Sequence, residues 1–243
     1  MSLAADPLDE ALDAMAAVGP DLTNGMSNHA PMAIEALCAL GRGDAVARWL
    51  DGYRASFAPR PPRAQAVRED DWRRALRDGR RMTDWFDFFE RALADATWTE
   101  VVDRWAARLA PGISASAMHG VIRTGHAVRA LARAETPPRR RELADGLAYW
   151  AAEYQALPTD DAPAGVPRRP MDAISHVPSV PAADRRFTGT IVASIDGLAD
   201  FPPFAPAIGL ADLEGDPVRT VSELSEAFAR AYLAKPLAVA THH

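Results

Sequence analysis

The chain has a single cysteine and a single lysine. Cys38 has no partner for an internal disulfide, and the sequence lacks the CxxC spacing of a thiol redox site. Arginine supplies the positive charge apart from Lys235, and the formal net charge is -6. Nucleic acids and anionic membrane surfaces are bound through basic stripes, which this composition does not favour. We therefore expect no nucleic-acid partner.

Long apolar runs are also missing. No run reaches the roughly 18 to 20 residues that a membrane-spanning helix needs. Residues 1–19 lack the basic start and the apolar core of a signal peptide. We expect no membrane partner and a cytoplasmic location. With 243 residues, 48% of them hydrophobic, the chain can bury a sizeable core.

Several motifs that mark common enzyme classes do not occur. The sequence has no GxGxxG segment, no GxxxxGK[ST] loop, no GxSxG elbow and no HExxH helix. It also lacks the Glu-x-x-His pairs of di-iron helical bundles. A conventional flavin monooxygenase, hydrolase or kinase is therefore disfavoured, and no flavin motif is present.

Start and stop signals divide the first 157 residues into helices. Thr97 and Glu100 have the spacing of a capping box. The predicted helical segments are 6–19, 28–42, 44–57, 70–78, 83–95, 97–109, 118–134 and 137–157.

The remainder is less regular. Residues 159–186 are rich in Pro, Asp and Arg and predict a long connection, either a lid or a segment wrapped over the core. Residues 188–195 alternate weakly like a strand, although their neighbours favour a helical turn. A last helix is predicted over 220–234. We expect one all-α domain over 1–243, with an internal pocket and few or no strands.

Two histidines and an arginine share a face of the helix predicted over 118–134. At about 100° per residue, His119, Arg123 and His126 form a polar stripe. The stripe either is the solvated side of an amphipathic helix or lines an internal cavity. His119 and His126 are separated by roughly 10.5 Å of helix rise, which disfavours one metal ion bound by these two alone. Arg123 suits the binding of a carboxylate, phenolate or enolate oxygen.

His29 stands at the start of another predicted helix, where the helix dipole disfavours the imidazolium form. A neutral imidazole can be a metal ligand, a base or a hydrogen-bond donor. Asn28 either caps the helix or polarises a substrate carbonyl. We expect His176 to be solvated, and His242 and His243 to belong to a frayed terminus or an artificial tag.

Several stretches in order resemble the questin oxidase-like family: "SNHAPMAIEALCALGR" at 27–42, "WLDGYRASF" at 49–57, "MHGVIRTGHAVRAL" at 118–131 and "ELADGLAYWAAEYQALP" at 142–158. The resemblance implies a helical oxidoreductase that opens aromatic polyketides, anthraquinones in particular, by oxygen-dependent Baeyer-Villiger-type or ring-cleaving oxidation. It also implies NADPH and a histidine-bound iron centre. His29 and His119 fall on the family's NH and HG motifs. Family members usually continue beyond "AYLA" into another helical region, so this C-terminus is short for the family.

The leading hypothesis is that His29, His119 and His126 converge as catalytic groups or iron ligands, with Arg123 stabilising a developing oxyanion. The partner is a small aromatic substrate, and a homo-oligomer remains open. The residues expected to bind the substrate are Asn28, Met32, Trp85, Tyr149 and Trp150. One alternative is a non-catalytic helical protein that binds small molecules after losing metal ligands. Another is a cofactor-free oxygenase in which a histidine deprotonates the substrate.

Overall fold

A computed structural model describes residues 6–159, 166–185 and 189–234. The chain forms two compact units, Met1–Leu157 and Pro158–His243, which are described separately below. The single domain expected over 1–243 stays a prediction. His242 and His243 lie outside the described residues.

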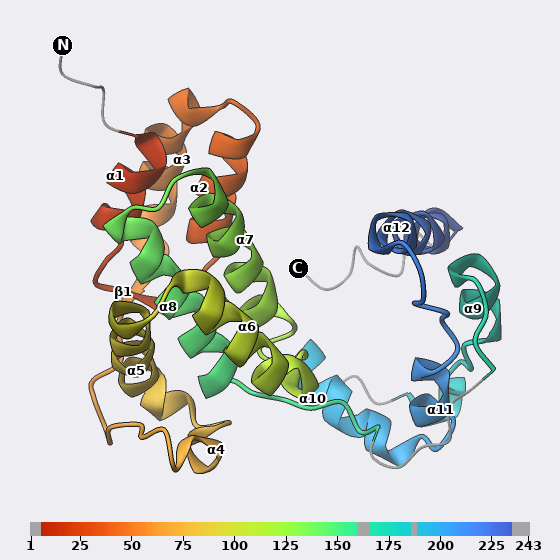
Figure 1. The fold of residues 1–243 in the computed structure, drawn as a ribbon. Helices are drawn as coiled ribbons and strands as arrows, with labels where there is room; N and C mark the ends of the chain where they lie inside the picture. The colour runs from red at the N-terminus through yellow and green to blue at the C-terminus, as the bar shows by residue number, and fades with distance from the viewer. Residues whose placement is uncertain (1–5, 160–165, 186–188, 235–243) are drawn as a thin grey trace. The chain divides into compact units, whose positions relative to one another are not determined.

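The described part of the chain is mainly helical, which confirms the all-α fold class (Figure 1). The helices of the first unit are α1 (Pro7–Ala14), α2 (Ala30–Ala39), α3 (Val46–Tyr53), α4 (Trp72–Ala75), α5 (Met82–Asp95), α6 (Trp98–Leu109), α7 (His119–Arg133) and α8 (Pro137–Ala152). Short 3-10 turns cover Gly43–Ala45, Arg54–Ser56, Gly79–Arg81 and Ala110–Gly112. The capping box is confirmed, because Glu100 N donates to Thr97 Oγ1 (3.3 Å) and Thr97 N donates to Glu100 Oε2 (3.0 Å).

Two short strands begin within the last residues of two predicted helices. They are β1 (Val18–Leu22) and β2 (Phe57–Pro59), which pair antiparallel. Helix α1 ends at Ala14 and helix α3 at Tyr53, so the chain is already extended where the predicted helices 6–19 and 44–57 end. The strand β1 leads through a turn to His29, so this small sheet fixes the path of the chain into α2.

Helix α8 is the centre of the first unit. It packs against α5 on one side and α7 on the other. Almost every residue after its first turn and a half is buried, since the sequence from 143 to 152 is apolar on all sides apart from Asp145. An aromatic cluster fills the space between α8 and its neighbours: Trp72, Trp85, Phe88, Phe89 and Trp105. A second cluster joins α1, α2 and α3.

Glycines allow α7 and α8 to touch through their backbones. A Cβ on Gly120 would lie 2.6 Å from Trp150 Cα, and one on Gly146 would lie 3.0 Å from Thr124 N. A side chain at Gly120 would therefore force the helices apart. This close crossing carries His119, the residue before Gly120, to a fixed place relative to Tyr149 and Trp150.

The second unit contains α9 (Pro170–His176), α10 (Ile191–Asp196), α11 (Phe204–Ile208) and α12 (Pro217–Ala234), with 3-10 turns at Ala182–Asp184 and Gly197–Asp200. Helix α9 lies within the predicted connection 159–186, which is therefore partly helical. Of the strand and the helical turn considered for residues 188–195, the structure has a helix over 191–196. The Thr190 hydroxyl caps this helix by accepting from Ala193 N (3.2 Å). The predicted helix 220–234 is confirmed as part of α12. His176 is exposed at the end of α9, as expected.

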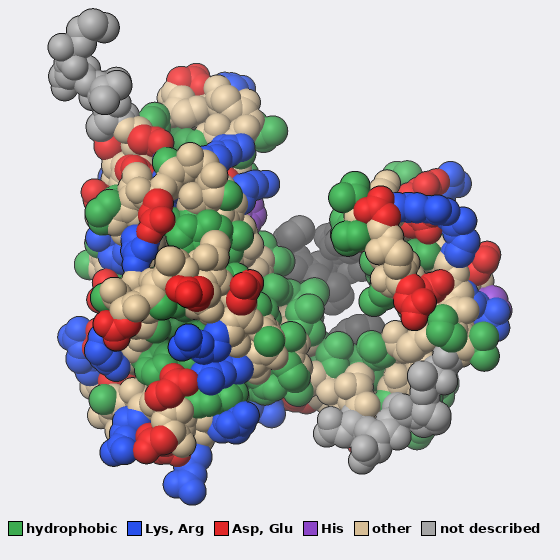
Figure 2. Space-filling view, in the orientation of Figure 1, with side chains coloured by type: hydrophobic (Ala, Val, Ile, Leu, Met, Phe, Trp, Pro, Cys, Tyr) green, Lys and Arg blue, Asp and Glu red, His purple; other side chains and the backbone are tan. Residues whose placement is uncertain are grey.

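Charged side chains of both signs are interspersed on the face of the first unit that Figure 2 displays. Ion pairs of the first unit include Arg63 with Asp87 and Arg108 with Glu69. That face therefore has no large field of one sign. Among the helices of the described ranges, none combines the length and the apolar character needed to cross a membrane. The cytoplasmic location and the absence of a nucleic-acid partner stay predictions.

Replacing Gly120 by alanine tests the helix crossing. We expect Gly120→Ala to lower the free energy of unfolding by about 1–3 kcal/mol, because the new methyl group overpacks the contact with Trp150. The matched control is Gly125→Ala on the exposed side of the same helix, where nothing lies within 4 Å of the new Cβ. That variant should gain about 0.5–1 kcal/mol. Urea denaturation measures both, and equal stability of the two variants would contradict the close crossing.

Candidate functional site

His29 and His119 meet at the start of helices α2 and α7. Their Nε2 atoms are 2.9 Å apart, and the rings lie nearly perpendicular, at 84°. His119 Nδ1 lies 2.6 Å from the carbonyl oxygen of Ser116 and donates its proton there. This bond fixes the tautomer of His119, so its Nε2 faces His29 with a lone pair. The structure thus brings together two of the three histidines that the sequence singled out.

The histidine pair is accessible and is suited to accept one proton. His29 is exposed and His119 is half-buried. Partial burial lowers the pKa of His29, and a positive charge on His119 would lower it further, while a backbone hydrogen bond with Ser27 acts in the opposite direction. His29 is therefore neutral at neutral pH. One proton between the two Nε2 atoms makes a hydrogen bond, whereas a second proton would place two positive charges in contact.

A buried phenol lies beneath the histidine pair. Tyr149, 2% exposed, donates its hydroxyl proton to Asp21 Oδ1 (2.9 Å). The Tyr149 hydroxyl oxygen also lies 2.9 Å from Ser27 Oγ and 2.6 Å from Ser116 Oγ. Burial raises the pKa of Tyr149, and the nearby charge of Asp21 raises it further. The phenol therefore keeps its proton.

Asp21, Ser27 and Ser116 were not found by sequence reasoning. Burial also raises the pKa of Asp21, although the hydrogen bond from Tyr149 and the charge of Arg123 act against this. The two serines precede the histidines by two and three residues, but serine in a loop carries no functional signal by itself. Only the position of Tyr149 in the fold relates the three residues to one another.

The backbone just before His119 is strained. Ser116, Ala117 and Met118 have φ values of 45°, 53° and 71°, in the left-handed region that residues with a side chain seldom adopt. Each such residue costs roughly 1–2 kcal/mol. Left-handed residues in succession persist only where surrounding contacts hold them, and they occur often at functional sites. Here the segment places the Ser116 carbonyl against the ring of His119.

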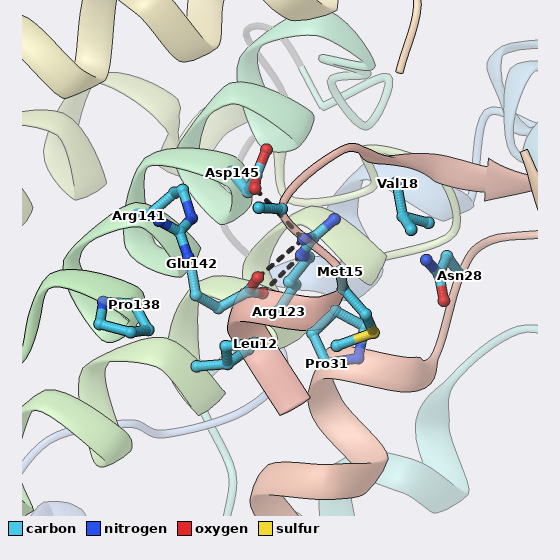
Figure 3. A pocket seen from close by; sticks show the side chains of 11 residues that line it. Leu12, Met15, Val18, Asn28, Pro31, Arg123, Pro138, Arg141, Glu142 and Asp145 are labelled. Atoms are coloured by element: carbon cyan, nitrogen blue, oxygen red, sulfur yellow. Dashed lines mark hydrogen bonds and ion pairs between the residues drawn. The ribbon is translucent and has the colours of Figure 1, made fainter. Parts of the chain in front are cut away.

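Arg123 does not face the histidine pair. It is 4% exposed, and its Nε and Nη2 donate to Glu142 Oε1 (2.6 Å) and Oε2 (2.8 Å), as Figure 3 shows. Asp145 lies beyond, with Oδ2 3.8 Å from Arg123 Nη2. The cavity beside this ion pair has a volume of about 10 Å³, which is room for about one water molecule. This cavity is therefore too small for a polycyclic substrate, and charged side chains line part of it.

The polar stripe predicted on α7 needs correction at Arg123. Arg123 lies on the buried face, together with Gly120, Thr124, Ala127, Ala130 and Leu131. The physical reason is that α8 presents the buried carboxylates Glu142 and Asp145 to this face, which α7 alone does not reveal. Since its donors are bound to Glu142, Arg123 is not free to stabilise an oxyanion as expected.

His126 also stands apart from the pair. Its Nδ1 lies 2.7 Å from Glu35 Oε2 on α2, and Arg129 donates to the same carboxylate through Nε and Nη2. Burial raises the pKa of Glu35, but the hydrogen bonds from Arg129 and His126 outweigh it and hold the pKa below its usual value. The expected convergence of three histidines is therefore wrong. Across the described ranges, no group of three or more His, Cys, Asp or Glu residues is placed to hold a metal ion.

The residues expected to bind the substrate are buried, and the polar atoms of Asn28, Trp85 and Trp150 are bound to the protein's own backbone. Asn28 Nδ2 donates to Gly19 O (3.2 Å) and its Oδ1 accepts from Ala30 N (3.0 Å), so it shapes the entry into α2. Trp85 Nε1 donates to Ala75 O, and Trp150 Nε1 donates to Gly112 O. Met32 is 6% exposed. Their substrate contacts stay predictions.

A family model described as questin oxidase-like matches residues 26–224, which is most of the chain. The chain therefore belongs to the questin oxidase-like family. Searches among curated proteins and among solved structures found no match. The matched range includes both histidines of the pair and Tyr149, while Asp21 precedes it. The family suggests an oxidoreductase.

Replacing Arg123 distinguishes a structural ion pair from a substrate clamp. We expect Arg123→Met to lower the free energy of unfolding by about 3–5 kcal/mol, because Glu142 is left as an unpaired buried charge. The double variant Arg123→Met/Glu142→Leu should recover most of this loss. Arg133→Met, at an exposed position of the same helix, is the control and should stay within about 0.5 kcal/mol of the original protein. Unchanged stability of Arg123→Met in urea denaturation would contradict the assignment.

Proposed function

We propose that this questin oxidase-like protein is an oxidoreductase that oxidises a phenolic or quinonoid aromatic molecule with O2, and that His29 and His119 act together as its general base. The observation that carries the proposal is the 2.9 Å contact between their Nε2 atoms at an accessible position. An anthraquinone-like polyketide is the substrate class that the family favours.

The chemistry follows from the protons of the pair. His119 donates from Nδ1 to Ser116, so its Nε2 has no proton of its own. When a phenolic substrate binds, its O–H bond breaks and the proton passes to the space between the two Nε2 atoms. The substrate becomes a phenolate, which gives up electrons more easily than the phenol. General-base catalysis of this kind contributes typically about 10²–10⁴-fold to a rate.

The charged pair then takes the role that Arg123 was expected to play. After proton transfer the two imidazoles share one positive charge beside the new phenolate oxygen. The proton, held between two nitrogens, makes a short hydrogen bond rather than an exposed cation. Arg123 remains bound to Glu142, so the charge that stabilises the anion comes from the base itself.

Iron and NADPH are family expectations. A mononuclear non-haem iron centre with two histidines usually adds a carboxylate as a third protein ligand. The pair supplies two imidazoles, and the described ranges contain no three-residue donor group. These residues do not fit a complete iron centre, so no step is assigned to iron. NADPH would supply two electrons in a monooxygenase form of the reaction, and no residue is assigned to it.

The incomplete donor set also favours a second candidate. A helical protein that has lost metal ligands can keep the aromatic ligand and lose the reaction. In that case the protein binds a hydroxyanthraquinone without consuming O2. The two functions therefore differ in oxygen uptake and not in ligand affinity.

Oxygen consumption with 1,8-dihydroxyanthraquinone and NADPH tests the proposal. We expect His29→Asn and His119→Asn each to lower kcat/KM by about 10²–10⁴-fold, since asparagine keeps polarity but is not a base. The control is His176→Asn, which changes an exposed histidine of the second unit and should leave kcat/KM unchanged. Iron content of the fresh protein is measured in parallel, and turnover is repeated with a strong chelator.

Three outcomes would count against the proposal. Full activity in both variants would exclude the pair as the base. Ligand binding without oxygen uptake would support the binding protein. Stoichiometric iron that is lost in His119→Asn, with turnover abolished by the chelator, would assign the pair to a metal centre.

A further inference from the structure

The Tyr149 hydroxyl is the point at which both histidine-bearing loops are joined. It contacts Ser27 Oγ at 2.9 Å and Ser116 Oγ at 2.6 Å. The two serine hydroxyls are themselves 3.2 Å apart. Ser27 precedes His29 by two residues, and Ser116 precedes His119 by three. The two hydrogen bonds at Tyr149 thus tie one loop to the other.

Proton accounting gives each bond at Tyr149 a direction. The phenol has one proton, and the carboxylate of Asp21, which accepts only, receives it at 2.9 Å. Both lone pairs of the phenol oxygen are then directed to the two serines, which donate to it. The hydroxyl is thereby saturated, with one bond donated and two accepted. By accepting the phenol proton, Asp21 thus determines that both serines donate to Tyr149.

The strained segment before His119 explains why a contact with Tyr149 is needed. Ser116, Ala117 and Met118 all have left-handed backbone conformations without a glycine among them. Without an external contact this segment would relax toward ordinary conformations, and the Ser116 carbonyl would turn away from His119 Nδ1. Tyr149 reaches Ser116 from helix α8, which is fixed in the centre of the unit.

We propose that Tyr149, oriented by Asp21, is a positioning residue that holds Ser27 and Ser116 and so keeps the Nε2 atoms of His29 and His119 in contact. Tyr149 is buried, and its hydroxyl group is bound to Asp21, Ser27 and Ser116. It acts through the two loops. The consequence for catalysis rests on the proposed function, whereas the positioning itself does not and is tested without a substrate.

The test is the tautomer of His119 in protein labelled with ¹⁵N-histidine. In the original protein at one fixed pH, we expect His119 to be the Nδ1–H tautomer, with an Nδ1 proton that exchanges slowly with water because it is bound to Ser116. Tyr149→Phe removes the hydroxyl and nothing else. We expect the His119 ring to shift toward the Nε2–H tautomer of a free imidazole. With two hydrogen bonds lost, exchange of the Nδ1 proton should accelerate about tenfold or more.

Two controls separate positioning from general stability. Tyr53→Phe removes the hydroxyl group of a tyrosine whose ring stacks on Trp49, and it should leave the tautomer and the exchange rate of His119 unchanged. Val101→Ala, at a position 1% exposed on α6, lowers the stability of the core and should also leave the His119 signals unchanged. A spectrum of Tyr149→Phe identical to that of the original protein would overturn the proposal.

A milder variant covers the case in which Tyr149→Phe does not fold. Ser116→Ala removes one hydroxyl and keeps Tyr149 and Asp21 in place, so we expect an intermediate change in the His119 tautomer. Unchanged His119 signals in Ser116→Ala would overturn the proposal as well. If the tautomer shifts as expected while the oxygen-uptake assay shows no dependence on either histidine, the positioning stands and the proposed function fails.

Discussion

The hydrogen bonds at one buried hydroxyl group connect the parts of the molecule on which the site depends. Tyr149 comes from α8, Asp21 from β1, and the two serines from the loops that enter α2 and α7. Each loop ends at a histidine, and the two imidazoles meet. Helix α8 can anchor this arrangement because it is packed between α5 and α7, with Gly120 allowing the closest approach. Core packing therefore determines the geometry of two accessible side chains.

The three polar side chains that form a stripe on α7 each have different partners. His119 contacts Ser116 and His29, Arg123 is paired with Glu142, and His126 binds Glu35. The two carboxylates belong to different helices, so each pair joins α7 to another element. A buried ion pair such as Arg123–Glu142 adds little net stability but is costly to break, which favours a single arrangement of the helices. One histidine of the stripe is thus left for chemistry, while Arg123 and His126 connect α7 to its neighbours.

Local patterns predicted most of the helices, because caps, prolines and apolar periodicity act within a few residues. The capping box at Thr97 and the start of α8 at Pro137 are examples. The family motifs also identified His29 and His119. Helical-wheel arithmetic failed for Arg123, since the buried side of α7 is determined by carboxylates of α8. Nothing local indicates that Ser116 is left-handed or that Asp21 lies beside Tyr149, because both depend on how distant segments pack.

The central claim is that the Nε2 atoms of two imidazoles, 90 residues apart in the chain, lie in contact and can hold one proton between them. A crystal structure at atomic resolution tests this most directly through the separation of the two Nε2 atoms. We predict that these atoms lie within hydrogen-bond distance, with His119 Nδ1 on the carbonyl oxygen of Ser116 and the Tyr149 hydroxyl between the two serines. Imidazoles that turn away from each other into solvent, with Ser116 in an ordinary right-handed or extended conformation, would contradict the account.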